Sequence, residues 1–392
     1  MKKIQKIFIS NLGVLVCCII LMILVACLPL SPTEAIETSG IRQDNLPVVI
    51  TTLESRQNYI TYIKEKKDGV NEVWAINPET RVSTLIASGN RLYSKDWSPS
   101  GDYLLFADNF SLYIANANGS GILRVYEVKE KSFIAAWWLS DDIILFDVYV
   151  IDSNDMIWPP PRQYYVNIKN GERGQLYQES GMNDSGQYLI QGIIPADKSW
   201  IQINGFTGEV NIANLQGNIT KILDGYNLRY PIGALGIEFV PEKKSIVFLA
   251  PQKDLINANE SLDSLWEMPL SEKEPKLIVE ETPNIQFYEY HISPNGRYLA
   301  YTYGDGSKYI ISILNLQTYK FEYYWDFPYH ASTPSFVWSP DSRFIAFPYA
   351  NSESGTKPVT SFGIQVMDIT NGSTKVLVTE DVVLGNWHYI SR

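Results

Sequence analysis

The sequence contains few of the residue types from which most catalytic and metal sites are built. Its 392 residues include three histidines and three cysteines, and the last cysteine is Cys27. No Gly-x-Ser-x-Gly nucleophile elbow, His-Glu-x-x-His zinc motif, phosphate-binding loop or dinucleotide-binding glycine pattern is present. The region beyond Cys27 therefore has no cysteine nucleophile, thiolate metal site or disulfide. We predict no catalytic residue, no metal site and no cofactor.

Positive charge is also scarce. The chain has 32 Lys and Arg residues against 43 Asp and Glu, a net charge of −11. An acidic surface is repelled by phosphate backbones and by anionic lipid headgroups. Nucleic acid is therefore excluded as a partner. The simplest explanation of the net negative charge is that it keeps the protein soluble at a cell surface.

The N-terminus has the pattern of an export signal. A basic segment, Met1–Lys6, precedes an uninterrupted apolar run, Leu12–Ala26, which is short for a membrane-spanning helix. The run ends in Leu24-Val25-Ala26-Cys27, which resembles the bacterial lipobox, in which the cysteine becomes the first mature residue and carries the lipid. Because the exported part keeps this one cysteine and makes no disulfides, we expect the Cys27 thiol to be lipidated.

The lipobox defines three predicted regions. Residues 1–26 are a lipoprotein signal peptide, 27–47 are a flexible tether rich in Pro, Ser and Thr, and 48–392 are a folded domain. The protein is then a membrane-anchored lipoprotein facing the extracellular side or the periplasm. Two alternatives remain: an uncleaved membrane anchor, or ordinary signal cleavage with Cys27 as a bystander. Cleavage at Cys27 removes three lysines and makes the net charge −14.

A repeated unit fills the rest of the chain. The phrase Trp97-Ser98-Pro99-Ser100-Gly101-Asp102-Tyr103 returns as Trp338-Ser339-Pro340-Asp341-Ser342-Arg343-Phe344, and His291–Tyr301 is a third copy. Weaker copies lie between them. The turn positions are Pro99, Asp141, Pro195, Pro241, Pro294 and Pro340. Their steps are 42, 54, 46, 53 and 46 residues, a range typical of four-stranded propeller blades.

The two ends of the chain decide the number of blades. The segment Tyr59–Ile86 contains three strands of a blade without its first strand, and Trp387 lies 49 residues beyond Trp338, in phase with the repeat. A C-terminal strand that completes the N-terminal blade would close the ring and leave no unpaired edge there. We predict an all-β, seven-bladed propeller of four-stranded antiparallel blades. A β-sandwich or two separate β-domains are the alternatives.

These turns resemble the TolB-type, WD-like propeller repeat of bacterial proteins, an aromatic-Ser-Pro-Asp-Gly turn followed by an (Ile/Leu)-Ala-Phe strand. The resemblance covers about Tyr59 to Ile390, with three strong copies and three degenerate ones. TolB itself carries a further N-terminal α/β domain, for which the residues between Cys27 and Tyr59 are too few. The resemblance implies a propeller fold and partner binding; it does not imply TolB's role.

Candidate binding residues follow from strand alternation. Loops that join the second and third strands of a blade must emerge opposite the Ser-Pro turns, and the longest ones there are Val148–Pro161, Ala250–Ser261 and Tyr349–Thr360. Aromatic residues with a polar tip are common at binding surfaces. The predicted partner-binding residues are these: Tyr149, Asp152, Asp155, Trp158, Tyr230, Tyr329 and His330. The alternative is that the aromatic residues only pack the loops. The cluster Asp152–Asp155 lacks the full spacing of a calcium loop.

Two function classes remain open. The first is a lipid-anchored binding or scaffold module for a protein or peptide, with a glycan as a further option. The second is a propeller enzyme, a polysaccharide or peptide hydrolase or lyase, with paired carboxylates at the channel. Asp147, Glu289 and Asp305 are the candidate carboxylates. For His291 and His388, which lie at or beside the aromatic position before a turn, we expect a packing role.

Overall fold

The computed structural model describes part of the chain. The described residues are 48–49, 53–54, 56–66, 69–117, 121–128, 132–151, 157–176, 188–204, 209–223, 237–251, 263–272, 274–280, 286–304, 308–328, 335–350 and 362–390. They belong to one compact unit, Asn45–Arg392. Cys27, the predicted signal peptide and the predicted tether lie outside the described residues.

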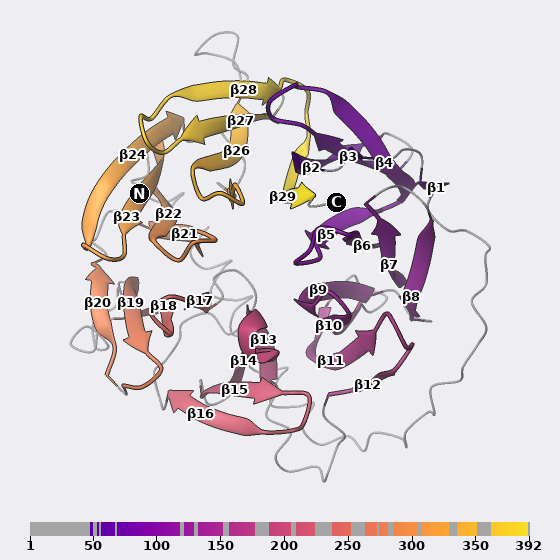
Figure 1. Cartoon of the computed structure of the whole chain (residues 1–392), viewed down its shortest axis with the longest axis horizontal. Helices are drawn as coiled ribbons and strands as arrows, with labels where there is room; N and C mark the ends of the chain where they lie inside the picture. The colour runs from indigo at the N-terminus through magenta and orange to yellow at the C-terminus, as the bar shows by residue number, and fades with distance from the viewer. Residues whose placement is uncertain are drawn as a thin grey trace, which may run out of the picture. The chain divides into compact units, whose positions relative to one another are not determined.

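Seven antiparallel sheets form a ring around a central opening (Figure 1). We name them blades A to G in chain order. Blades B to D contain β5 (Tyr93–Trp97), β6 (Tyr103–Ala107), β7 (Ser111–Asn116), β8 (Ile122–Glu127); β9 (Ser132–Ser140), β10 (Ile143–Ile151), β11 (Ile157–Asn167), β12 (Arg173–Gln175); β13 (Tyr188–Ile194), β14 (Ser199–Asn204), β15 (Val210–Asn214) and β16 (Ile219–Leu223). A single 3-10 turn, Pro195–Asp197, connects β13 to β14.

Blades E to G repeat the same order. They contain β17 (Glu238–Val240), β18 (Ser245–Pro251), β19 (Asp263–Pro269), β20 (Lys276–Val279); β21 (Gln286–Ile292), β22 (Tyr298–Gly304), β23 (Lys308–Asn315), β24 (Lys320–Pro328); β25 (Val337–Trp338), β26 (Phe344–Ala350), β27 (Phe362–Asp368) and β28 (Thr374–Val378). In each of these blades the first strand is innermost and the fourth is outermost. The predicted seven-bladed propeller is confirmed.

Blade A joins the two ends of the chain. Its strands, from the channel outward, are β29 (Val383–Ile390), β2 (Gln57–Glu65), β3 (Val70–Ile76), β4 (Ser83–Asn90) and β1 (Val48–Val49). Trp387 of β29 pairs with Ile60 of β2 and is 9% exposed. The predicted closure of the ring by the C-terminal strand is therefore confirmed. The short outer strand β1 was not predicted, because two residues carry no periodicity.

The Ser-Pro turns share one hydrogen-bonded geometry. The amide of Ser339 donates to the carbonyl of Phe344 (2.8 Å), and the Ser339 hydroxyl accepts from the Phe344 amide (2.8 Å). Ser342 closes the turn onto the Ser339 carbonyl at a φ of 61°. Gly101 and Gly296 hold the same place at 76° and 68°. The motif needs a residue that tolerates positive φ there, which explains its glycine.

Aromatic residues from these turns hold neighbouring blades together. The stacked pairs are Tyr103 on Trp138, Tyr298 on Trp338, and Phe344 on Trp387, with ring centroids 6.2, 6.3 and 6.3 Å apart. In each pair the first ring follows a turn and the second lies in the innermost strand of the next blade. The Trp338 indole also donates to the carbonyl of His291, 3.1 Å away in the preceding blade. The repeated aromatic residues therefore act between blades.

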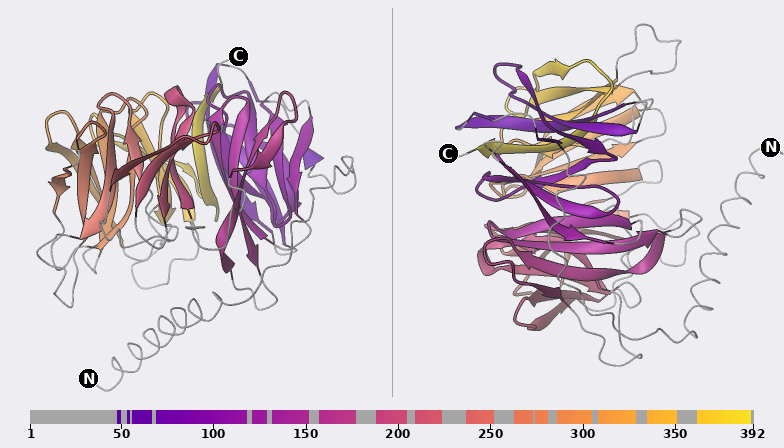
Figure 2. Two further views of the ribbon diagram at one scale, coloured as in Figure 1. Left: turned by 90° about the horizontal axis from the view of Figure 1, so that it is seen from below. Right: turned by 90° about the vertical axis from the view of Figure 1, so that its right-hand side faces the viewer.

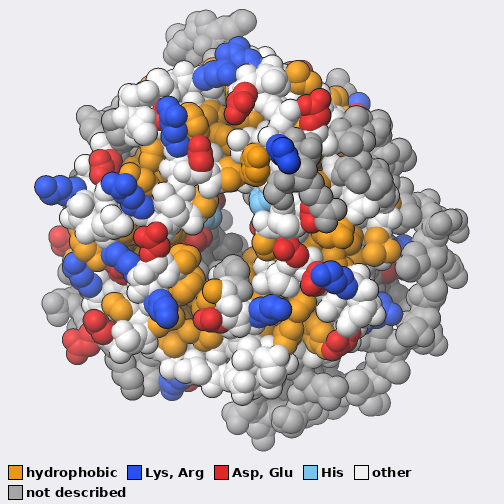
Figure 3. All heavy atoms as spheres, viewed as in Figure 1, with side chains coloured by type: hydrophobic (Ala, Val, Ile, Leu, Met, Phe, Trp, Pro, Cys, Tyr) orange, Lys and Arg blue, Asp and Glu red, His pale blue; other side chains and the backbone are white. Residues whose placement is uncertain are grey.

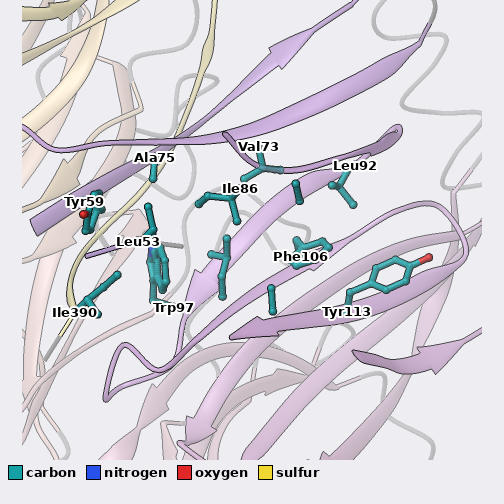
Figure 4. Close-up of a cluster of buried hydrophobic side chains, with 13 residues drawn as sticks. Leu53, Tyr59, Val73, Ala75, Ile86, Leu92, Trp97, Phe106, Tyr113 and Ile390 are labelled. Atoms are coloured by element: carbon teal, nitrogen blue, oxygen red, sulfur yellow. The ribbon is translucent and has the colours of Figure 1, made fainter. Parts of the chain in front are cut away.

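The junction between blades A and B receives an extra layer from the chain that precedes β2. Leu53 is 5% exposed and packs with Trp97 and Ile390, as Figure 4 shows. Its amide donates to the carbonyl of Ala117 (3.3 Å), and the amide of Arg56 donates to that of Ile390 (2.6 Å). The N-terminal segment of the domain thus fastens the junction at which the ring closes.

One predicted loop is shorter than expected. The sequence assigned Val148–Pro161 to a loop, but β10 continues to Ile151 and β11 begins at Ile157. The pairing shifts from Val148↔Arg162 to Val150↔Trp158, so the three prolines between Trp158 and Arg162 fall in an irregularity of the ladder. Proline is tolerated at such a place, because no ladder hydrogen bond is required from it.

The strand directions define two faces of the ring. We call the face that carries the turns between first and second strands the turn face; these turns and the C-terminus lie on the same side in Figure 2. The strand ends at Ile151, Pro251 and Ala350 lie on the opposite face, as alternation predicts. The segments that follow them, 152–156, 252–262 and 351–361, lie outside the described residues.

Candidate functional site

A set of side chains lines the channel at one level of the repeat. The position three residues before the turn proline belongs to the innermost strand, and its occupants in four blades are Asp96, Glu238, His291 and Val337. Asn386 of β29 lies 49 residues beyond Val337 and takes this position in blade A. All five are exposed or partly exposed, whereas the adjacent Trp97 and Trp338 are buried. Strand alternation accounts for the difference, because the tryptophans point to the interblade core.

Three ionisable groups meet on the wall formed by blades E and F. His291 Nδ1 lies 2.9 Å from Oε1 of Glu238 in β17, and its Nε2 lies 3.0 Å from Oε1 of Glu289 in β21. The second oxygen of Glu289 accepts from the amide of Phe336 (3.2 Å), and the Phe336 ring meets the imidazole edge-on, with centroids 5.2 Å apart. We call these three residues the Glu-His-Glu cluster.

The cluster holds a positive imidazole between two carboxylates. Burial alone would lower the pKa of His291, but the hydrogen bonds to Glu238 and Glu289 outweigh it and raise that pKa to about 10. Both ring nitrogens then donate, so the imidazolium is fully hydrogen-bonded. The side chains of His291, Glu238 and Glu289 are 38%, 31% and 25% exposed. Channel solvent therefore reaches all three.

A second polar pair lies on the wall formed by blades A and B. Oδ1 of Asp96 accepts from the amide of Trp97 (2.7 Å) and from Nδ2 of Asn386 (3.0 Å). The surrounding protein raises the pKa of Asp96 to about 6, against the effect of these two hydrogen bonds. His388 of β29 stacks on Trp97, with centroids 6.1 Å apart. Burial lowers the pKa of His388 to about 4, so this histidine is neutral at neutral pH.

The two walls face each other across the channel. Blades C and D separate them on one side and blade G on the other. Figure 3 shows the open centre of the ring with histidine side chains, in pale blue, at its border. At neutral pH the two walls present three carboxylates and one imidazolium. These two walls together thus have an excess of negative charge.

The predicted binding residues are only partly described. Tyr149 lies in β10, half-buried, with its ring 6.0 Å from that of Phe133. Trp158 lies in β11, where its backbone pairs with Val150. Asp152, Asp155, Tyr230, Tyr329 and His330 lie outside the described residues, as does Asp305. Their binding roles remain predictions.

The candidate carboxylates and histidines do not all lie where the sequence predicted: some reach the channel and others are packed in the interior. Glu289 reaches the channel, whereas Asp147 is fully buried between blades C and D, so the two are not a catalytic pair. His388 packs on an aromatic ring as expected. His291 does not occupy the packing position, because it lies two residues before the turn serine and not one. Two features of the sequence could have indicated the Glu-His-Glu cluster. They are this offset of one residue and the glutamate at the matching position, three residues before Pro241.

No group of three or more His, Cys, Asp and Glu side chains within the described ranges is arranged to hold a metal ion. Among the same residues, no helix has the length and hydropathy needed to span a membrane.

Comparisons with known proteins identify the fold only. No protein-family model and no curated protein matches the sequence. Among solved structures, TolB from Acinetobacter baumannii is 14% identical, with a TM-score of 0.45 over 83% of this chain and 81% of that one. A prolyl endopeptidase is 12% identical, with a TM-score of 0.57 over 86% of this chain and 50% of its own. Prolyl oligopeptidase B from Galerina marginata is 13% identical, with a TM-score of 0.53 over 84% and 52%. This chain is similar to these proteins in its β-propeller.

Proposed function

We propose that this protein is a lipid-anchored binding module of the cell envelope, whose propeller holds a protein or peptide partner through a cationic group in the channel. The observation that carries the proposal is the pair of facing walls, on which three carboxylates are accompanied by only one imidazolium. A Lys or Arg side chain of a partner would supply the missing positive charge. Hydrogen bonds between such a cation and a carboxylate are charge-assisted and therefore stronger than neutral ones.

The geometry favours recognition over proton transfer. Both nitrogens of His291 are already bonded to carboxylates, and its pKa of about 10 keeps it protonated at neutral pH. A general base must lose and gain a proton near the working pH. His388 is stacked on Trp97 and carries no charge at that pH. His291 therefore acts through its positive charge, and His388 acts through its packed position.

The predicted face of contact is the one opposite the turn face. Strand alternation brings the ends of β10, β18 and β26 to it, and Asp152 and Asp155 follow β10 in the chain. Tyr149, Trp158, Tyr230, Tyr329 and His330 are proposed to border the channel mouth on that face. Attachment through lipid on Cys27 would keep this module at a membrane surface and limit its partners to envelope components.

Binding of charged peptides tests the channel. We expect a lysine-rich peptide to bind the propeller in calorimetry, and a glutamate-rich peptide of the same length not to bind. Asp96→Asn combined with Glu238→Gln should weaken the interaction about tenfold or more, since a charge-assisted hydrogen bond contributes about 1.5–3 kcal/mol. Glu272→Gln, on the exposed turn after β19, is the control. Equal affinity for both peptides, or an unchanged affinity in the double variant, would refute the cationic group.

Intact mass tests the anchor. Protein extracted from membranes should begin at Cys27 and carry added lipid mass, and Cys27→Ser should leave the precursor uncleaved at this site. A mature N-terminus elsewhere, or an unmodified Cys27, would remove the anchor from the proposal without affecting the channel.

An enzyme that acts on a peptide or polysaccharide is the second candidate. The observation in its favour is that Glu238 and Glu289 form a carboxylate pair at the channel, which the enzyme alternative required. Asp96, with a pKa of about 6, is the channel group best suited to exchange a proton near neutral pH. Turnover of a peptide or glycan by the wild type that is lost in Asp96→Asn, with binding retained, would favour this candidate.

A further inference from the structure

A buried carboxyl group lies between blades C and D, away from the channel site. Asp147 is in the middle of β10 and has no exposed surface. Oδ1 accepts a hydrogen bond from Nε2 of Gln163 in β11 (3.0 Å), and the amide of Ile190 in β13 also bonds to this carboxylate. Oδ2 has no hydrogen-bond partner among the described residues, and almost no surface that a water molecule could reach. Such a group is costly in its charged form.

The facing blade offers more polar groups at the same level. Ile190 pairs with Gln202 of β14, and Gln202 pairs with Asn211 of β15. Gln202 and Asn211 are two residues from Trp200 and Ala213, which pack in the core between blades C and D, so alternation turns them to that interface. Both are buried.

Two buried acceptor atoms at this interface have no hydrogen-bond partner among the described residues. Asn211 Nδ2 donates to Oε1 of Glu209 (2.9 Å), and the Asn211 Oδ1 atom has no partner among the described residues. Oδ2 of Asp147 is likewise an unsatisfied acceptor. A proton on Asp147 removes the buried charge and converts Oδ2 into a donor. The neutral carboxylic acid thus avoids both a buried charge and an unsatisfied acceptor at Oδ2.

We propose that Asp147 is a proton-dependent latch between blades C and D: the neutral acid holds β10 against β13, and loss of its proton loosens that interface. β10 pairs with β11, so the latch controls how firmly these two strands of blade C are held against blade D. The inference does not depend on the channel as a binding site.

The surroundings of Asp147 set the pH range of the latch. Burial raises the pKa of Asp147 to about 7, against the opposing effects of Gln163, the Ile190 amide and the Tyr149 hydroxyl. The other titratable groups that face the interface are Tyr165 of β11 and Glu209, which precedes β15 and is paired with Lys221 (2.8 Å). No cation is among the causes of the Asp147 shift. At Asp147, the folded chain thus binds up to one more proton than the unfolded chain between about pH 4 and about pH 7, and the contribution of this group to stability falls as the pH rises through that range.

The test compares the full chain with Asp147→Asn, which has the shape of the neutral acid and cannot ionise. Thermal midpoints are measured across the range from about pH 4 to above pH 7. We expect the midpoint of Asp147→Asn minus that of the wild type to increase with pH up to about pH 7 and to level off above it. Asp96 and His388 also titrate in this range, but they are common to both proteins and cancel in the difference. A difference that is constant with pH would overturn the latch.

Asp368→Asn is the matched control. Asp368 is also buried, but hydrogen bonds from Arg343 and Thr370 outweigh burial and lower its pKa. Because its pKa is lowered from 3.8, Asp368 is ionised in both the folded and the unfolded chain above about pH 5, so the cost of its neutralisation should stay constant over most of the range tested. Hydrogen exchange of the wild type gives a second readout that needs no variant. After correction for the intrinsic rate, amides of β10 and β13 should exchange faster above about pH 7 while those of β22 do not; equal behaviour of the three strands would also refute the latch.

Discussion

Each of the two channel walls contains one histidine, and the two histidines have different charge states at neutral pH. On the wall of blades E and F, His291 lies between Glu238 and Glu289 and is protonated at neutral pH. On the wall of blades A and B, His388 lies against Trp97 and is neutral. Burial alone would lower the pKa of both imidazoles, so burial does not account for the difference. The difference comes from the carboxylates within 3.0 Å of His291.

The two walls also differ in what holds them together. Blades E and F are consecutive in the chain, and the Glu-His-Glu cluster adds charged contacts to an interface that the chain already connects. Blades A and B are also consecutive, but β29, the innermost strand of blade A, comes from the other end of the chain, and the interface depends on β29, Trp97, Leu53 and the Ser98–Gly101 turn. We therefore expect substitutions on the wall of blades A and B to affect stability, and those on the wall of blades E and F to affect charge.

Deletion of Leu384–Arg392 should have the largest effect. It removes the innermost strand of blade A, exposes the edge of β2, and takes away Trp387. Loss of a buried Trp alone costs about 3–5 kcal/mol, a large part of the 5–15 kcal/mol that stabilises a typical domain. The truncated chain should melt far below the full chain in calorimetry, or fail to fold. Equal melting temperatures would show that β29 does not close the ring.

Gly101→Ala should have the next largest effect. A Cβ atom there would lie 2.7 Å from the carbonyl oxygen of Tyr389 in β29, and φ is +76°. Gly217→Ala is the control, because its φ is +80° and no atom lies within 4 Å of its Cβ. Both variants bear the left-handed backbone cost of about 1–2 kcal/mol, and only Gly101→Ala must also displace β29. In chemical denaturation, Gly101→Ala should be less stable than Gly217→Ala. Equal losses of stability would mean that the turn can move away from β29 without a cost in free energy.

The propeller could be predicted because its signals are local and repeated. Two of these signals, the Ser-Pro turn with its positive-φ residue and the alternation of the strands, depend on near neighbours in the chain. The third, the phase of Trp387, depends on the repeat length. The structure confirms the fold that they indicated. The Val148–Pro161 loop was misjudged for a related reason. Three prolines argue against a regular ladder, but not against a strand that bulges at that point.

The channel site could not be predicted in the same way. Glu238 and His291 are 53 residues apart and meet only because each lies at the same level of an adjacent innermost strand. Whether a histidine in this repeat packs or lines the channel depends on an offset of one residue from the turn serine. The sequence identifies Asp147 as a candidate carboxylate. Its burial between two blades depends on how the sheets stack, which no local pattern encodes.

Glu289→Gln should change the charge of the wall of blades E and F more than the stability. Glutamine still accepts a hydrogen bond from His291 but carries no charge, so the pKa of His291 should fall from about 10. Because the folded pKa is raised, the stabilising contribution of His291 is complete below the unfolded pKa of 6.5 and is lost as the pH rises through about 10. NMR titration of the imidazole should show the lower pKa, and the alkaline loss of stability should begin at a lower pH. The imidazole is 38% exposed, so the loss at neutral pH should be no more than about 1 kcal/mol. An unchanged titration would remove Glu289 from the cluster.

His388→Phe should have the smallest effect at neutral pH, because phenylalanine can keep the stack on Trp97 and the native histidine is uncharged there. The two proteins should separate in acid. Burial lowers the pKa of His388 to about 4, so the unfolded chain binds a proton that the folded chain does not as the pH falls from about 6.5 to about 4, and the wild type loses stability over that range. The variant has no group to protonate there and should retain that part of its stability. Thermal midpoints of the two proteins across this range measure the difference, and Tyr389→Phe, on the exposed neighbour, is the control. If the wild type and His388→Phe lose stability in parallel, His388 is protonated in the folded chain, and the contrast between the two walls does not hold.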